Sequence, residues 1–247
     1  VIGRNNLYPP DPAGVPNEPV ALNDGYRVMY MINTTNDYSL NGGATWTSIP
    51  LPPVAGAGDG ICCDPDIIYD QRTGTSIRSF LVYDVAGDDY VVLAVRRNVA
   101  AADNCFYYLN PAGLVTPDYP HLGLTNKYLY VSMNNVSAVA WVNSQVWRIN
   151  LDNIVDCVGA AFTTYTYTGP LQRVFTPVRG TEQRDRAYWG SLECSPACAT
   201  LTTSTNVFRI FRWLETSAAP SAFTRAISAS PHNNPDCRGG TNNADWI

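Results

Sequence analysis

The sequence has few charges, one lysine and no long apolar run, and these shortages exclude several classes of protein. Charged residues make up 15% of the 247 residues, and Lys127 is the single lysine among 16 basic residues. The formal net charge of −5 disfavours nucleic acid or an anionic membrane as the main partner, because both repel an acidic protein. No apolar stretch approaches the roughly 18 residues that a membrane-spanning helix needs. We therefore expect no nucleic-acid partner and no membrane span.

Residues of the common catalytic and metal-binding motifs are also scarce. The chain has two histidines, His121 and His232, and no Gly-x-Ser-x-Gly turn, so a Ser/His/Asp hydrolase is disfavoured. No Asp-x-Asp-x-Asp-Gly loop is present to bind calcium. We expect no cofactor and no metal, although a calcium ion held by clustered acidic side chains stays open as an alternative.

Short runs of β-branched and aromatic residues are what the sequence does contain. They are bounded by Gly, Asn, Asp or Pro, and no segment of twelve or more residues has an apolar stripe of helical period. Glycine and proline contribute 18 residues each, which suits tight turns between strands. The pattern predicts an all-β fold. The clearest predicted strands are 26–32, 79–84, 90–96, 127–134, 145–151 and 207–213.

Four segments share one layout: a polar or acidic opening, a short strand, a tight turn and a second strand. They open near Glu18, Asp64, Asp118 and Arg186. Spacings of about 50 residues are typical of propeller blades with four strands each. We therefore predict a single β-propeller domain of four-stranded antiparallel blades over residues 1–247. The predicted blades are 17–60, 61–115, 116–180 and 181–243, and 244–247 begin a further blade.

The stretch YSLNGGATWTSI, residues 38–49, has the composition of a specialised turn. A side-chain oxygen bonds backbone N–H groups of such a turn, glycine takes a positive φ, and an aromatic ring packs beneath it. Ser39, Asn41, Gly43 and Trp46 resemble the Asp-box of the sialidase-like (BNR-type) β-propellers, with Asn41 at the usually acidic position. The resemblance implies that this turn joins the third and fourth strands of a blade and serves folding.

Three further segments look like parts of uncharacterised secreted members of the same superfamily: CCDPDIIYD, DYPHLGL with LYVSMN, and YWGSLE with FRIFRW. The resemblance covers roughly residues 17–215. It implies a six-bladed ring that this chain leaves incomplete. The chain lacks the Arg-x-Pro that true sialidases carry near the N-terminus, so the resemblance does not extend to sialidase activity.

The blade openings should point acidic and aromatic side chains into the central channel, where propellers bind ligands. The catalytic candidates are Asp64, Asp66, Asp118 and His121, and the ligand-binding candidates are Glu18, Tyr119, Tyr188 and Trp189, with Asp245 from the fifth opening. Carboxylates accept hydrogen bonds from sugar hydroxyls and aromatic rings stack on sugar faces. The alternative role is structural, because acidic residues at strand starts often only cap turns.

These candidate side chains at the opening of the central channel are compatible with two functions. One is a propeller that binds a glycan or an extracellular protein without catalysis. The other is an extracellular glycoside hydrolase or polysaccharide lyase that uses a pair of channel carboxyl groups. The sequence shows no complete set of catalytic residues, so we favour the binding function.

Seven cysteines without a clean zinc spacing predict a disulfide-bonded, secreted protein. Cys62 and Cys63 are adjacent and can bond to each other, stiffening the channel rim, or pair elsewhere. Cys105 with Cys157 can join neighbouring blades, and Cys194 with Cys198 can close a local loop.

The seventh cysteine raises the question of a partner chain. Cys194, Cys198 and Cys237 with His232 form an alternative zinc set. If the three disulfides form, Cys237 is left over, which suggests assembly with further chains or with a missing C-terminal segment.

Overall fold

The computed structural model describes a chain that is almost entirely β-strand. The described residues are 19–23, 27–33, 35–54, 56, 59–83, 89–97, 102–111, 115–137, 141–169, 175–179, 184–194 and 204–226. The predictions for Glu18, Cys198, His232, Cys237, Asp245 and the fifth blade lie outside these residues, and the side chain of Cys194 is not described.

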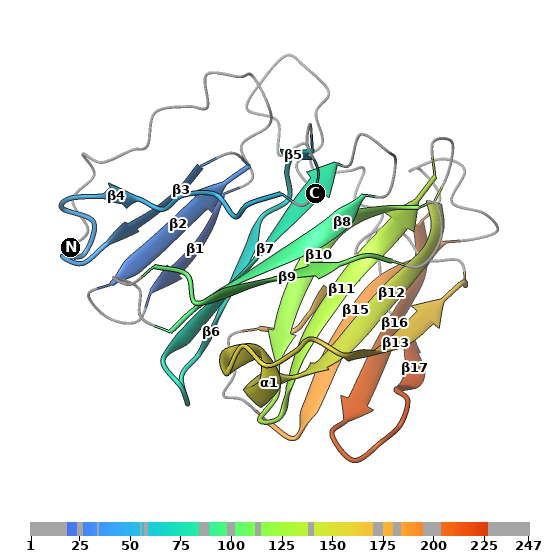
Figure 1. Ribbon diagram of the computed structural model, residues 1–247. Coiled ribbons are helices and arrows are strands. Elements are labelled where there is room, and N and C mark those ends of the chain that lie inside the picture. The colour runs from blue at the N-terminus through green and yellow to red at the C-terminus, as the bar shows by residue number, and fades with distance from the viewer. Residues whose placement is uncertain are drawn as a thin grey trace.

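The strands form four antiparallel sheets in chain order, β1–β4, β5–β9, β10–β13 and β14–β17 (Figure 1). We call them sheets 1 to 4. Within each sheet, strands that follow one another in the chain are hydrogen-bonded neighbours. The exception is sheet 2, where β5 and β6 both pair with β7. The strand bounds are β1 Val20–Asn23, β2 Val28–Ile32, β3 Thr35–Ser39, β4 Thr47–Ser48, β5 Gly60–Ile61, β6 Asp66–Asp70, β7 Thr75–Tyr83, β8 Tyr90–Arg96, β9 Cys105–Leu109, β10 Thr116–Leu124, β11 Tyr128–Val136, β12 Trp141–Asn150, β13 Phe162–Tyr167, β14 Thr176–Pro177, β15 Arg186–Cys194, β16 Ser204–Leu214 and β17 Ser221–Ala226.

The sheets are the blades of a β-propeller, as predicted. The first main strand of each sheet lies beside that of the next, so β1 contacts β6, β6 contacts β10, and β10 contacts β14. These four inner strands line the centre of the fan, and the later strands of each sheet lie progressively further out (Figure 1). Each inner strand is therefore placed to present side chains to the central channel.

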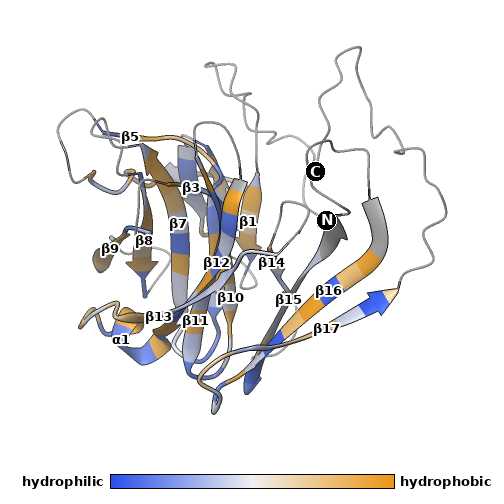
Figure 2. Ribbon diagram, turned by 90° about the vertical axis from the view of Figure 1, so that its right-hand side faces the viewer, coloured by the Kyte–Doolittle hydropathy of each residue, from blue (hydrophilic) through white to orange (hydrophobic). Residues whose placement is uncertain are grey.

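Three apolar clusters pack the sheets face to face. Met29 and Met31 of sheet 1 meet Ile67 and Phe80 of sheet 2, while Leu93 of sheet 2 belongs to a larger cluster shared with sheet 3. The third cluster, between sheets 3 and 4, is aromatic and consists of Tyr130, Val146, Phe175, Ala187, Trp189, Phe211 and Trp213. Along the second half of β16, Phe211 and Trp213 are buried in this cluster, whereas Arg212 and Leu214 between and after them are only partly buried, and Figure 2 shows hydrophilic bands between the hydrophobic residues of this strand.

The turn at residues 38–49 lies between β3 and β4, the third and fourth strands of sheet 1. The backbone N–H of Gly43 donates to Ser39 Oγ at 2.8 Å, and that of Thr45 donates to Asn41 Oδ1 at 2.9 Å. Gly43 has a φ of 91°, and a Cβ there would lie 3.5 Å from the Trp46 ring. The polar groups, glycine and tryptophan thus have the turn roles expected for them.

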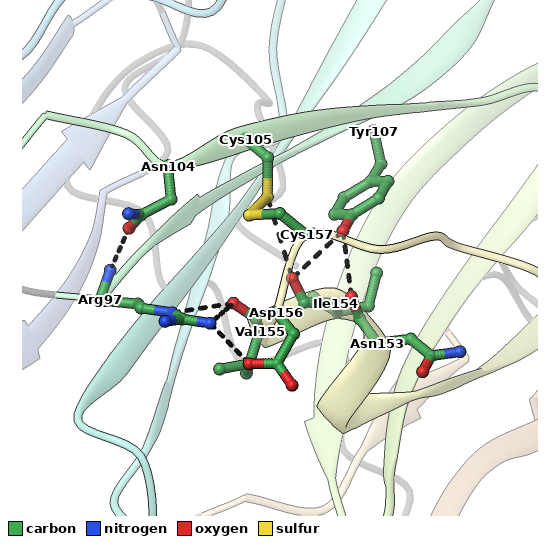
Figure 3. The surroundings of a disulfide bond; sticks show 9 residues. All are labelled: Arg97, Asn104, Cys105, Tyr107, Asn153, Ile154, Val155, Asp156 and Cys157. Atoms are coloured by element: carbon green, nitrogen blue, oxygen red, sulfur yellow. Dashed lines mark hydrogen bonds and ion pairs between the residues drawn. A yellow bond between two sulfur atoms is a disulfide. The ribbon is translucent and has the colours of Figure 1, made fainter.

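A short helix and a disulfide join sheets 2 and 3. Residues 145–151 were predicted as strand throughout, but the strand ends at Asn150 and α1 (Leu151–Val155) begins, because the Asn150 side chain accepts from Asn153 N–H and caps it. Cys105 of β9 is bonded to Cys157 beyond α1, as predicted (Figure 3). No helix among the described residues is long and apolar enough to cross a membrane.

Candidate functional site

The inner edge of sheet 2 is interrupted at the adjacent cysteines. Cys62 and Cys63 are bonded to each other, which confirms the predicted pair, and they lie between β5 and β6. The N–H of Cys62 still donates to Leu81 O at 3.0 Å, so the interruption stays attached to β7. Asp64 follows with a φ of 49°, which is unusual for a residue other than glycine. The disulfide therefore adjoins a sharp change of direction just before β6.

The inner strand of sheet 3, β10, is also irregular, at the point where it contacts Asp64. The pairing of β10 with β11 is regular at Asp118 and again at His121, and the bulge between them contains Tyr119, whose φ is 50°. The N–H of Tyr119 donates to Asp64 Oδ2 at 3.3 Å. Two irregular segments of neighbouring inner strands are thus joined directly. Bulges of this kind commonly redirect side chains next to binding sites.

Asp66 is a buried carboxylate with several partners. It is 3% exposed, and its Oδ1 accepts from Ile67 N–H at 2.8 Å and from Arg179 Nη1 at 2.6 Å. Its Oδ2 accepts from Leu122 N–H of β10 at 2.7 Å and also pairs with Arg179 Nη2. Both oxygens are therefore occupied by partners within the protein. Burial lowers the pKa of Arg179 to about 10, so the guanidinium is still charged at neutral pH.

His121 lies beside this ion pair, with its Nδ1 3.8 Å from Asp66 Oδ2. Burial lowers the pKa of His121 below its ordinary value, and the Asp118 carboxylate opposes that shift. The His121 ring lies 6.2 Å from that of Tyr119.

Tyr83 completes the cluster, and the sequence alone did not single it out. It is 49% exposed, and its hydroxyl lies 3.9 Å from Cys63 Sγ. Its pKa is raised by burial of part of the ring and by the carboxylates of Asp64, Asp89 and Asp118. Tyr119 is 40% exposed. We call the surface formed by Asp64, Tyr83, Asp118, Tyr119 and His121 the rim patch.

Two of the predicted ligand-binding residues lie elsewhere. The inner strand of sheet 4 is β14, so β15, which contains Tyr188 and Trp189, is the second strand of the blade and not the first as expected. Trp189 is 1% exposed and stacks on Phe211 at 5.7 Å in the core between sheets 3 and 4. Tyr188 pairs with Arg212 of β16 and is half-buried. A two-residue inner strand such as β14 has no periodicity by which a sequence could reveal it.

Among the described residues, no group of three or more His, Cys, Asp or Glu side chains is arranged to hold a metal ion. The rim patch contains carboxylate acceptors, an imidazole whose pKa is lowered by burial, and two partly exposed phenol rings. Such a set suits recognition of hydroxyl-rich or C–H-rich surfaces.

Comparisons with known proteins support the fold and no closer relationship. No protein-family model matches the sequence, and no curated protein matches it. An ACO/RPE65 chimera in a monoclinic crystal form is similar in structure, with a TM-score of 0.50 and 11% identity over 82% of this chain and 46% of its own. At that identity the similarity shows a shared propeller fold and nothing about activity.

Two glycoside-active proteins give lower scores. They are the α-L-arabinanase of Cellvibrio cellulosa, with a TM-score of 0.46 and 14% identity over 79% of this chain and 69% of its own, and the exo-β-1,3-galactanase of Phanerochaete chrysosporium, with a TM-score of 0.47 and 12% identity over 85% and 49%. The chain thus spans just under half the length of the chimera and of the galactanase.

Proposed function

We propose that the protein is a secreted propeller of the sialidase-like type that binds a glycan at the rim patch without catalysing a reaction. The observation that carries this proposal is the position of the exposed Tyr119 ring, which lies in a bulge whose backbone is bound by Asp64 and which is flanked by Asp118 and His121. Sugar hydroxyls would donate to the carboxylates, and the phenol rings of Tyr119 and Tyr83 would pack against pyranose C–H groups.

The arrangement of Asp66 favours binding over glycoside hydrolysis. Hydrolysis by two carboxyl groups needs one of them to reach the glycosidic oxygen and the other to reach the sugar or a water molecule. Both oxygens of Asp66 instead bond Arg179 and the N–H groups of Ile67 and Leu122. Asp66 therefore has the contacts of a residue that holds three blades together. Asp64 is 8% exposed and accepts the Tyr119 N–H, so the half-buried Asp118 is the carboxylate that a ligand would meet first.

Secretion is the setting that the cysteines support. The disulfide between Cys62 and Cys63 borders the rim patch, and the disulfide between Cys105 and Cys157 links sheets 2 and 3. Stable disulfides form in oxidising compartments and are uncommon in the cytosol. The sialidase-like type is supported by the turn at residues 38–49, which lies between a third and a fourth strand.

A glycan array read beside a panel of chromogenic glycosides tests the proposal. We expect one class of glycan to be retained by the wild type and lost by Tyr119→Ala, with no release of chromophore. The matched control is Tyr108→Ala, because Tyr108 is an exposed tyrosine on β9, an outer strand. Turnover of a glycoside that Asp64→Asn abolishes would replace the proposal by the hydrolase alternative.

A further inference from the structure

Arg78 is a cation buried in the apolar interface between sheets 1 and 2. It lies on β7 opposite Ile67 of β6 and Ala94 of β8, and its side chain is 0% exposed. Ile67 and Ala94 pack against Met29 and Met31 of sheet 1, so this face of sheet 2 is turned toward sheet 1. Burial of a guanidinium here is costly unless all of its donors are satisfied.

Only part of the Arg78 guanidinium is satisfied. Its Nη2 pairs with Asp103 Oδ1, and the same oxygen accepts from Arg96 Nε at 3.1 Å. Nε and Nη1 of Arg78 make no hydrogen bond with any described residue. The nearest ring is that of Phe80, whose centroid lies 5.6 Å from Cζ of Arg78. One carboxylate oxygen thus serves two cations, and Nε and Nη1 of Arg78 lie buried without a hydrogen bond.

The missing partner has to be small and able to accept hydrogen bonds. Buried donors in native proteins are almost always paired with protein groups, water or an ion. Ala94, directly opposite Arg78 on β8, fills only the volume of a methyl group. A monovalent anion would accept from both nitrogens and would also balance charge, which a water molecule cannot do. Burial and the nearby Arg96 lower the pKa of Arg78, and a negative charge beside the guanidinium would oppose that lowering.

We propose that a small monovalent anion, of the class of chloride, binds Nε and Nη1 of Arg78 between sheets 1 and 2 as a structural ion. It would enter when the two sheets pack, since Arg78 has no contact with solvent once they have done so. The ion would stabilise the folded state by binding it and not the unfolded chain. This proposal is independent of the rim patch, which is formed by other residues.

Crystals grown with bromide in place of chloride test the site directly. We expect one anomalous peak within hydrogen-bond distance of Nε and Nη1 of Arg78. A peak explained by water alone, or no peak at either nitrogen, would overturn the proposal. Because this experiment uses the wild-type chain, it does not depend on whether any variant folds.

The stability of the protein in different sodium salts gives a second, independent readout. At matched ionic strength, chloride and bromide should raise the melting temperature above that in gluconate, and the rise should grow with the logarithm of the halide concentration as expected for one ion bound per folded chain. Arg78→Met should remove this dependence on the anion. Arg72→Met is the control, because Arg72 is an exposed arginine paired with Asp152, and it should retain the dependence. Equal melting temperatures of the wild type in chloride and gluconate would count against a structural anion.

Discussion

The carboxylate of Asp66 pairs with the guanidinium of Arg179, 113 residues later in the chain, and so joins sheet 2 to sheet 4. The same carboxylate accepts the N–H of Leu122 from sheet 3, at 2.7 Å. One side chain therefore connects the inner edges of three blades. The Asp66 side chain is 4% exposed and that of Arg179 is 30% exposed, so solvent weakens the pair on the arginine side only in part.

Removal of this carboxylate should destabilise the whole propeller. Asp66→Ala leaves the buried Leu122 N–H without its acceptor and the partly exposed Arg179 without its counter-charge, so we expect the free energy of unfolding to fall by about 2–3 kcal/mol. Denaturant titration followed by tryptophan fluorescence measures it. Asp152→Ala, which breaks the exposed pair with Arg72, is the control and should cost far less. Equal losses in the two variants would show that Asp66 does not have this structural role.

The two described disulfides should differ sharply in their effect on stability. The bond between Cys105 and Cys157 closes a long loop, with a sequence separation of 52, and replacement of both residues by Ala should cost about 2–4 kcal/mol of unfolding free energy. The bond between Cys62 and Cys63 closes no long loop, so the matching double Ala variant should lose less global stability. The same denaturant experiment compares them. A larger loss of stability in the Cys62/Cys63 variant than in the Cys105/Cys157 variant would contradict this prediction.

His121 should titrate below its ordinary pKa, because burial disfavours the imidazolium. A depressed pKa means that the unfolded chain binds a proton first as the pH falls below about 6.5. This contribution to stability is therefore complete above that pH and is lost as the pH falls toward the folded pKa. NMR titration should show it, with His121→Gln assigning the signal. Asp118→Asn should lower the pKa further, and a value above 6.5 in the wild type would contradict the burial argument.

The sequence was sufficient to predict a propeller of four-stranded antiparallel blades, the disulfides among Cys62, Cys63, Cys105 and Cys157, and the turn at residues 38–49, but β14 lies inside the predicted third blade and belongs to the fourth. Strands such as β8 were found because whole runs of residues, here Tyr90–Arg96, favour strand. The turn was found because its side chains bond within a few residues of one another. These features depend on local chemistry, which a single sequence records.

The parts that escaped prediction depend on distant contacts or on very short elements. Arg179 could not be assigned to Asp66, because nothing near either residue signals a pair so far apart in the chain. The inner strand β14 has two residues and no pattern, so Trp189 was placed in the channel when it belongs to the core. Helix α1 has five residues, too few for an apolar stripe, although Asn150 before it is a recognisable cap.

Isothermal titration of the best glycan from the array tests the central claim, binding at the rim patch, most directly. An aromatic contact contributes on the order of 1 kcal/mol beyond the area that it buries, so Tyr119→Ala should weaken the affinity about tenfold. Tyr108→Ala, on the outer strand β9, should leave the affinity of the wild type unchanged. If Tyr119→Ala binds the glycan as tightly as the wild type and Tyr108→Ala do, the rim patch is not the binding site.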